Sequence, residues 1–379
     1  MLAHFCHHLI VALLNPLLPY IRNEFSLTYT QSGWLVFAFG LSYGLTQIPG
    51  GWLADRIGPR TILTIGVAGI AVAGLLIGIS PNYVMTALFL ILLGAAGGGY
   101  HPAAAPLVSA SVEPGSRGRA LGLHQIGGTG SFFLAPLIAA GIAGILGWRG
   151  TFIAISVPSI VFSIVFFILL GRLKYGIETG ESSSVDKAKL ATASGHSRRL
   201  KVIMALGIAS MALGYSIISF IPLFAVDHFD GVSNEAAAAM LSLVYFSGLL
   251  AGPLGGYLSD RLGREPIVIT MGLITGPAIY MLNMAPLGIG FSAVLIIIGV
   301  VVHVCMPVVE AYIISHTTER RRSTILGIYY LGSRGGLVIA PAIGYIIDHY
   351  SFYIGFSITG AIMTTVAIAC TTLLLIKRS

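Results

Sequence analysis

The fold of this chain is indicated by a stretch that occurs twice, first as Gly51-Trp52-Leu53-Ala54-Asp55-Arg56-Ile57-Gly58 and then, 205 residues later, as Gly256-Tyr257-Leu258-Ser259-Asp260-Arg261-Leu262-Gly263. The same shift aligns further pairs without a gap over about 85 residues: Pro102 with Pro307, Leu121-Gly122 with Leu326-Gly327, Gly127 with Gly332, Gly130 with Gly335 and Ala135-Pro136 with Ala340-Pro341. Self-similarity at a fixed spacing indicates a repeated structural unit. We therefore predict two halves with the same topology.

The composition excludes a soluble protein. Of 379 residues, 56% are hydrophobic and only 9% are charged, and the mean hydropathy is +0.90. A soluble domain carries about 25% charged residues, and a disordered chain is polar, so the outer surface of this chain faces lipid. The cysteines Cys6, Cys305 and Cys370 lie far apart in apolar stretches, which argues against a disulfide framework or a zinc site.

Twelve apolar stretches are long enough for transmembrane helices, which need about 20 residues to cross the bilayer. They are too long and too uniformly apolar for the strands of a membrane barrel. The expected spans are 2–22, 30–54, 61–80, 83–111, 119–147, 150–171, 201–227, 235–258, 266–285, 287–316, 323–348 and 352–376. The sequence thus predicts an all-α membrane protein with an N-terminal six-helix bundle (1–172), a cytoplasmic linker (173–199) and a C-terminal six-helix bundle (200–379).

Basic residues indicate the orientation. Eighteen of the 21 Lys and Arg residues fall on one side of a twelve-span chain, two fall on the other side, and Arg334 lies inside a span. Because cytoplasmic loops carry the excess of basic residues, we expect a multi-pass protein of the cytoplasmic membrane with both termini in the cytoplasm. The net charge of +7 is then a topology signal spread over many loops, and we predict no nucleic-acid binding.

The stretch from Gly51 to Arg60 resembles the signature that follows the second helix in the major facilitator superfamily, G-x-L-x-D-R-x-G-R-[RK]. Its weaker copy falls in the corresponding loop of the second half, and the resemblance covers the whole chain. Gly99-Tyr100-His101-Pro102 and the glycine-rich helix after it look most like the fosmidomycin-resistance branch of exporters. The resemblance implies the major facilitator fold, with two pseudo-symmetric bundles and a solute site between them near mid-membrane.

In that family the signature latches the two halves in the outward-open state and releases on switching. The resemblance carries this role to the residues at matching positions: Gly51, Asp55, Arg56, Gly58 and Arg60, and more weakly Asp260, Arg261 and Arg264. Pro59 stands where the family usually has a basic residue, so one charge of the cluster is missing. The alternative is a plain surface turn whose arginines only set topology. If the latch interpretation holds, Asp55→Asn abolishes transport but not folding.

Ionisable residues inside a span are costly and therefore indicate function. Glu310 lies ten residues before Arg320, about 15 Å from the cytoplasmic surface, and Arg334 lies at about 18 Å on the next helix. A Glu310–Arg334 pair is therefore plausible. It is either a structural ion pair or a proton switch, in which protonation of Glu310 frees Arg334 to bind an anionic group of the solute.

Several other polar residues are expected to face a central cavity. His303 lies two turns before Glu310 on the same face, and His101 precedes Pro102 in a run of small residues, so both are proton-coupling candidates together with Glu310. The alternative for His101 is a structural bond to a carbonyl freed by the proline. The candidates for solute binding are Arg334, His124, Asn15, Tyr43, Gln47 and Tyr329, the position that repeats His124.

A second histidine group lies at the start of the chain. His4, His7 and His8 are spaced i, i+3, i+4 and could hold a metal ion. Their place near the N-terminus favours solvation at the membrane interface instead, so we predict no metal site.

The function favoured by the sequence is secondary active transport by alternating access. No G-x-x-x-x-G-K-[ST] loop occurs, so we expect no cofactor and a proton gradient as the energy source. Proton-coupled export of a small organic drug or metabolite comes first, and proton-coupled uptake of a small organic anion is the alternative. An intramembrane metalloenzyme that uses His101, His303 and Glu310 as a metal site is disfavoured because these residues do not have metal-ligand spacing on any single helix. A sensor would lack a signalling domain. The expected partners are the solute, protons and lipid, with a functional monomer.

Overall fold

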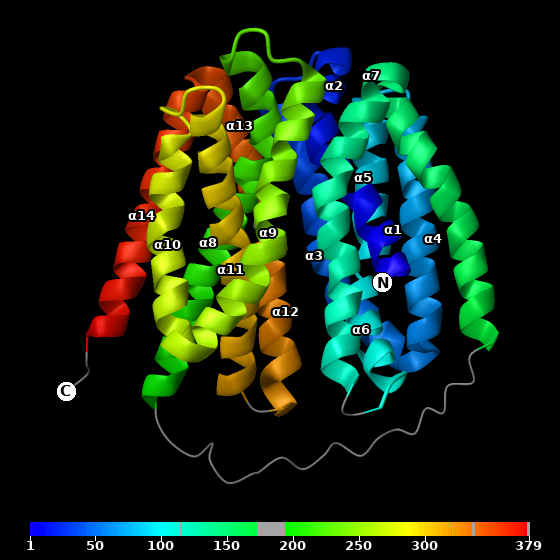
Figure 1. Cartoon of the computed structure of the whole chain (residues 1–379), viewed down its shortest axis with the longest axis vertical. Helices are drawn as coiled ribbons and strands as arrows, with labels where there is room; N and C mark the ends of the chain where they lie inside the picture. Colours follow the sequence, from blue (N-terminus) through cyan, green and yellow to red (C-terminus); the bar gives the residue numbers. More distant parts are fainter. Residues whose placement is uncertain (114–115, 173–193, 318, 336–337, 377–379) are drawn as a thin grey trace.

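The computed structural model describes residues 1–113, 116–172, 194–317, 319–335 and 338–376. Within these ranges the regular elements are helices, and there is no β-strand. Most of the helices run along the long axis of the molecule (Figure 1). The predicted all-α membrane fold is confirmed.

Each of the twelve predicted spans is helical over most of its length in the described ranges, and the spans 119–147 and 150–171 both fall within one element, α7. Eight helical stretches there are long and apolar enough to cross a membrane, and one of these, Arg119–Gly171, has 53 residues, enough for two crossings. The helices are α1 (Leu2–Val11), α2 (Leu14–Phe25), α3 (Tyr29–Ile57), α4 (Pro59–Gly78), α5 (Tyr83–Gly97), α6 (Tyr100–Ala110), α7 (Arg117–Arg172), α8 (Ser194–His228), α9 (Asn234–Leu262), α10 (Arg264–Met281), α11 (Ile289–His316), α12 (Glu319–Gly335), α13 (Ile339–His349) and α14 (Phe352–Leu375).

Three predicted spans consist of two consecutive helices: α1 with α2, α5 with α6, and α12 with α13. The break between α5 and α6 falls at Gly98 and Gly99, and Pro102 is the third residue of α6. A proline costs little there, because the first N–H groups of a helix have no partner within it. The break therefore places His101 in the first turn of a new helix, in the middle of the span.

Helices α1 to α7 lie together on one side of the molecule and α8 to α14 on the other (Figure 1). Helix α7 ends at Arg172 and α8 begins at Ser194 at the same end of the bundle, which we call the linker end; the opposite end is the far end. Of the predicted linker, residues 173–193 lie outside the described residues, and the last six belong to α8.

The sequence repeat is reproduced in the backbone. Gly58 follows the last residue of α3, with φ 90° and ψ 143°, and Gly263 follows the last residue of α9, with φ 93° and ψ 146°. Positive φ is accessible to glycine without steric cost. The helix contacts repeat as well: a Cβ at Gly94 would overlap Ser42 and the Phe39 carbonyl, and a Cβ at Gly299 would overlap the residues 205 positions on, Ser247 and the Val244 carbonyl.

The turn inside α7 depends on Gly147. Its φ of 67° and ψ of 177° separate the two crossings, and this region of backbone space is essentially restricted to glycine. Glu24 anchors the turn, because its Oε2 accepts a hydrogen bond from Trp148 Nε1 at 2.5 Å and its Oε1 pairs with Arg149.

We expect Gly147→Ala to destabilise the protein by about 1 to 3 kcal/mol, because alanine must adopt a strained backbone conformation there. The measurement is the thermal unfolding midpoint of purified protein in detergent. The matched control is Gly141→Ala, which lies in the same helix where an added Cβ meets no atom within 4 Å. Equal unfolding midpoints for the two variants would contradict the role of Gly147 in the turn inside α7.

Candidate functional site

The two halves are joined at the far end by polar contacts. Asp227 of α8 accepts a hydrogen bond from Tyr29 Oη at 2.6 Å and pairs with Arg22 of α2. Asp348 of α13 accepts from the backbone N–H groups of Tyr29 and Thr30, each at 2.8 Å. Tyr20 Oη donates to Glu235 at 2.6 Å. The far end is therefore closed by carboxylates of the C-terminal half that meet donors of the N-terminal half.

Tyr29 precedes the predicted span 30–54 and supplies both its hydroxyl and its backbone N–H to this closure. Burial and the hydrogen bond to Asp227 raise the pKa of the Tyr29 phenol above its ordinary value. The phenol therefore remains protonated, and a donor to Asp227, throughout the physiological range.

Backbone packing reinforces these contacts. A Cβ added at Gly33 of α3 would lie 2.7 Å from the Ala340 carbonyl oxygen and 2.8 Å from Pro341 Cα in α13. A Cβ at Gly344 would overlap the backbone of Tyr29 and Thr30. Helices approach this closely only where residues are small, so α3 and α13 meet main chain against main chain.

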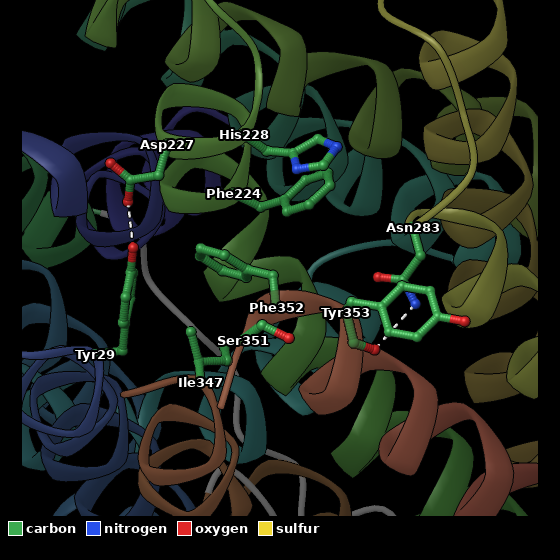
Figure 2. A pocket seen from close by; sticks show the side chains of 9 residues that line it. All are labelled: Tyr29, Phe224, Asp227, His228, Asn283, Ile347, Ser351, Phe352 and Tyr353. Carbon is green, nitrogen blue, oxygen red and sulfur yellow. Dashed lines mark hydrogen bonds between the residues drawn. The ribbon is translucent and has the colours of Figure 1, made fainter. Parts of the chain in front are cut away.

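A pocket of about 330 Å³ lies beside this closure (Figure 2). Its floor is aromatic, with His228 stacked on Phe224 at 4.5 Å between ring centroids. Across the pocket from Tyr29 and Asp227, Asn283 Nδ2 donates to the Tyr353 carbonyl at 3.2 Å. The lining residues are Tyr29, Phe224, Asp227, His228, Asn283, Ile347, Ser351, Phe352 and Tyr353, and the sequence-predicted site residues are not among them.

The predicted solvation of the first three histidines is wrong. His4 and His7 are 0% exposed and His8 is 3% exposed. Helix α1 begins at about mid-height of the bundle (Figure 1), and its histidines pack into the N-terminal half. Gly127 and Gly128 of α7 make room for it, since a Cβ at Gly128 would lie 2.5 Å from the His4 ring. These adjacent glycines are the sequence signal that points to close packing there.

Five histidines form one cluster with Tyr100. His8 Nε2 lies 3.1 Å from His101 Nε2, and His4 Nδ1 donates to the His124 carbonyl at 2.8 Å. The His4 ring stacks on that of His124 at 4.2 Å, and His7 packs on Tyr100 at 4.2 Å. The histidine cluster, defined as His4, His7, His8, His101 and His124, thus combines residues of α1, α6 and α7.

A row of rings leads from this cluster to the other half. His8 packs on Phe132 at 4.8 Å, Phe132 on Tyr245 of α9 at 5.4 Å, and Tyr245 on His303 of α11 at 6.0 Å. His303 Nδ1 also donates to the Gly299 carbonyl at 2.8 Å. His101 contacts His8, so the structure brings His101 and His303 to the two ends of one row, with His8, Phe132 and Tyr245 between them. Sequence reasoning missed both of these aromatic residues.

Glu310 lies in α11, seven residues beyond His303, and is half-buried. It interacts electrostatically with Tyr329 of α12, whose side chain is fully buried. The side chain of Arg334 lies outside the described residues, so the Glu310–Arg334 pair stays a prediction. Tyr329 is the solute-binding candidate that the structure places beside Glu310.

The remaining candidates are dispersed. Tyr43 is buried in α3, 6.4 Å from the His7 ring, and joins the edge of the histidine cluster. Gln47 lies one turn further along α3 and Asn15 lies in α2, and both are half-buried. Their proposed contact with solute stays a prediction.

The described latch residues contact their own halves. Arg60 donates to the Phe167 carbonyl at 3.1 Å, and Arg264 donates to the Ala311 carbonyl at 2.8 Å and lies 3.7 Å from Asp260. The two signature copies share one more contact, since Arg56 stacks over Trp52 and Arg261 over Tyr257 at 4.0 and 4.6 Å. The side chain of Asp55 lies outside the described residues, so its latch role stays a prediction.

The model of the Major Facilitator Superfamily matches residues 1–231 and 230–379, one match for each half. The chain belongs to the major facilitator superfamily. It is therefore a multi-pass membrane protein of a family whose members move small molecules through the bilayer, and the resemblance based on the repeated signature is confirmed.

Relatives of this superfamily member include proteins named as transporters of small organic compounds and proteins named for drug resistance. It is 25% identical to a probable sulfoacetate transporter of Cupriavidus necator, over 93% of this chain and 86% of that protein. It is also 25% identical to the fosmidomycin resistance protein of Escherichia coli, over 94% and 87%, which supports the expected likeness to that branch. The fold is similar to a bacterial homolog of the human lysosomal transporter Spinster, with a TM-score of 0.76, 18% identity and coverage of 98% and 94%.

Proposed function

We propose that this protein is a proton-coupled exporter of a small organic drug or metabolite, acting by alternating access in the cytoplasmic membrane as a monomer with both termini in the cytoplasm. The observation that carries the alternating-access part of the proposal is the closure of the far end by Gly33, Gly344, Asp227 and Asp348. Export is supported by the similarity to the fosmidomycin resistance protein. The described latch arginines at the linker end bond within their own halves. This arrangement is the one expected of a carrier in its inward-facing state, before solute binds from the cytoplasm.

In this proposal, the carboxylate of Glu310 takes up and releases the coupling proton. A carboxylate inside a span is costly unless it has a function, and Glu310 lies within α11, six residues before its last residue, His316, and beside the buried Tyr329. The groups that face this region are Tyr329 and Tyr330 of α12, Tyr215 of α8 and Cys305 of α11, together with the predicted partner Arg334. Protonation of Glu310 would remove the negative charge that holds Arg334 and free Arg334 to bind an anionic solute. Proton and solute would then bind together, so this switch fits symport. Export by antiport requires instead that the solute bind after Glu310 has released its proton.

Uptake of a small organic anion by proton symport is the second candidate. It is favoured by the names of two relatives, the probable sulfoacetate transporter and a cis,cis-muconate transport protein of Acinetobacter baylyi that is 25% identical. An arginine within the membrane would serve either direction. No covalent step is assigned to the protein in either case.

Everted membrane vesicles with an acidified lumen separate the two directions. The probes are fosmidomycin, sulfoacetate and cis,cis-muconate, chosen after a thermal-shift screen of the purified protein at two pH values. Export predicts that the probe accumulates in the acid lumen against its gradient. Symport predicts the reverse, that acidification speeds the loss of preloaded probe, and that result would contradict the export proposal.

A further inference from the structure

We propose that His4, His8 and His101 form a binding site for a divalent transition-metal ion of the zinc class, within the N-terminal half between α1 and α6. One ring nitrogen of each residue lies within 4.8 Å of the others. Imidazole is a preferred ligand for Zn²⁺, Ni²⁺, Cu²⁺ and Co²⁺. His4 and His8 lie one turn apart on α1. The third ligand, His101, joins them because α1 packs on the first turn of α6.

The distances fit a coordination shell. Zinc binds histidine nitrogen at about 2.0 to 2.1 Å in tetrahedral geometry, which places two nitrogen ligands about 3.3 Å apart. The Nε2 atoms of His8 and His101 are 3.1 Å apart. The rings of His4 and His8 lie 4.7 Å apart, and those of His4 and His101 lie 5.3 Å apart. The three ring nitrogens lie within 4.8 Å of one another, so the third nitrogen reaches the same centre by rotation of its side chain toward the other two.

His4 already has the outer contact that metal-binding histidines make. Its Nδ1–H donates to the His124 carbonyl at 2.8 Å, and such a bond fixes the tautomer so that Nε2 carries the lone pair. His4 Nε2 is buried and has no hydrogen-bond partner among the described residues. A buried polar atom without a partner costs free energy, and coordination to a metal would remove that cost.

The surroundings suit three neutral ligands with one open position. The rings of Tyr100, His124 and Phe132 form the walls, and His7, also buried, lies 4.7 Å from His8. His101 is half-buried and is the most accessible of the three ligands. Three histidines with an open fourth position are a common coordination set for zinc. The alternative is a network of histidines hydrogen-bonded to one another without an ion.

Metal titration of the full-length chain tests the proposal. The protein is purified with a histidine-free tag, stripped with a chelator and titrated with Co²⁺ alone and then with Zn²⁺. We expect one Co²⁺ per chain, with the visible absorption of a four- or five-coordinate ion, loss of that absorption when Zn²⁺ is added, and a rise in the thermal unfolding midpoint. No stoichiometric binding by the wild-type chain would overturn the proposal.

Variants identify the ligands. His8→Gln and His101→Gln are each expected to weaken Co²⁺ binding by at least about 100-fold, since loss of an outer contact alone costs about 10- to 100-fold. His124→Gln removes a ring that stacks on His4 but keeps the backbone carbonyl that His4 contacts, so we expect it to weaken Co²⁺ binding less than the loss of a ligand. His228→Gln and His349→Gln, both exposed, control for surface binding. A cooperative thermal unfolding transition of each variant without metal shows that the variant is folded. Wild-type affinity in His8→Gln and His101→Gln would sink the assignment.

Discussion

Gly33→Val is expected to abolish transport while each half still folds. Its side chain would overlap the main chain of Ala340 and Pro341, starting from a Cβ only 2.7 Å from the Ala340 oxygen. Overpacking of this kind costs about 1 to 3 kcal/mol, and at the upper end the far-end-closed state loses about 100-fold in population. A carrier held open at one end cannot complete its cycle.

Two measurements check this result. Solute flux in vesicles should fall to the background of empty membranes, and a cysteine introduced by Ile347→Cys, in the wall of the far-end pocket (Figure 2), should react faster with a water-soluble maleimide. Gly141→Val is the matched control, because an added Cβ there meets no atom within 4 Å. Normal flux in Gly33→Val would mean that the closure of α3 on α13 is not part of the cycle.

Glu310→Gln is expected to lower pH-gradient-driven transport by about 100-fold or more and to leave solute exchange without a gradient largely intact. Glutamine keeps the size of the side chain but cannot take up or release a proton. In exchange, the carrier crosses the membrane in both directions with solute bound, and no net proton movement is needed. A variant that keeps exchange but loses driven transport has therefore lost proton coupling and not solute binding. The measurement compares driven flux with exchange in the same vesicles.

The matched control is Glu265→Gln in the same half. Glu265 accepts from Tyr312 Oη at 2.6 Å and pairs with Arg199 at 2.6 Å near the linker end, so it is engaged in structural contacts. We expect this variant to retain driven transport. Persistence of proton-driven flux in Glu310→Gln would exclude the switch and leave Glu310 and Arg334 as a structural pair.

The spans and the repeat could be predicted because lipid imposes strong constraints on sequence. A stretch such as 61–80 must be apolar to cross the bilayer, and Gly58 and Gly263 must be glycine to turn between helices with positive φ. Glu310 could be found for the same reason, since a charge inside a span stands out against its surroundings. These features depend only on the local sequence and on the lipid bilayer that surrounds it.

Contacts between distant helices could not be predicted in the same way. The depth of His4, His7 and His8 is set by where α1 packs against Gly127 and Gly128, and hydropathy carries no such information. Asp227 and Asp348 read as ordinary charges at span ends, and only the meeting of the two halves makes them part of a closure. Phe132 and Tyr245 read as apolar filling, although together they connect two histidines.

The repeated glycine contacts have an evolutionary consequence. The same helix pair is held together in each half, by Gly94 against Ser42 and by Gly299 against Ser247. If one half arose by duplication of the other, each copy therefore kept its own helix packing. Positions away from these contacts were then free to diverge, and His101 in one copy corresponds to Met306 in the other. Natural selection could therefore place imidazoles in one half and a carboxylate in the other without rebuilding either bundle.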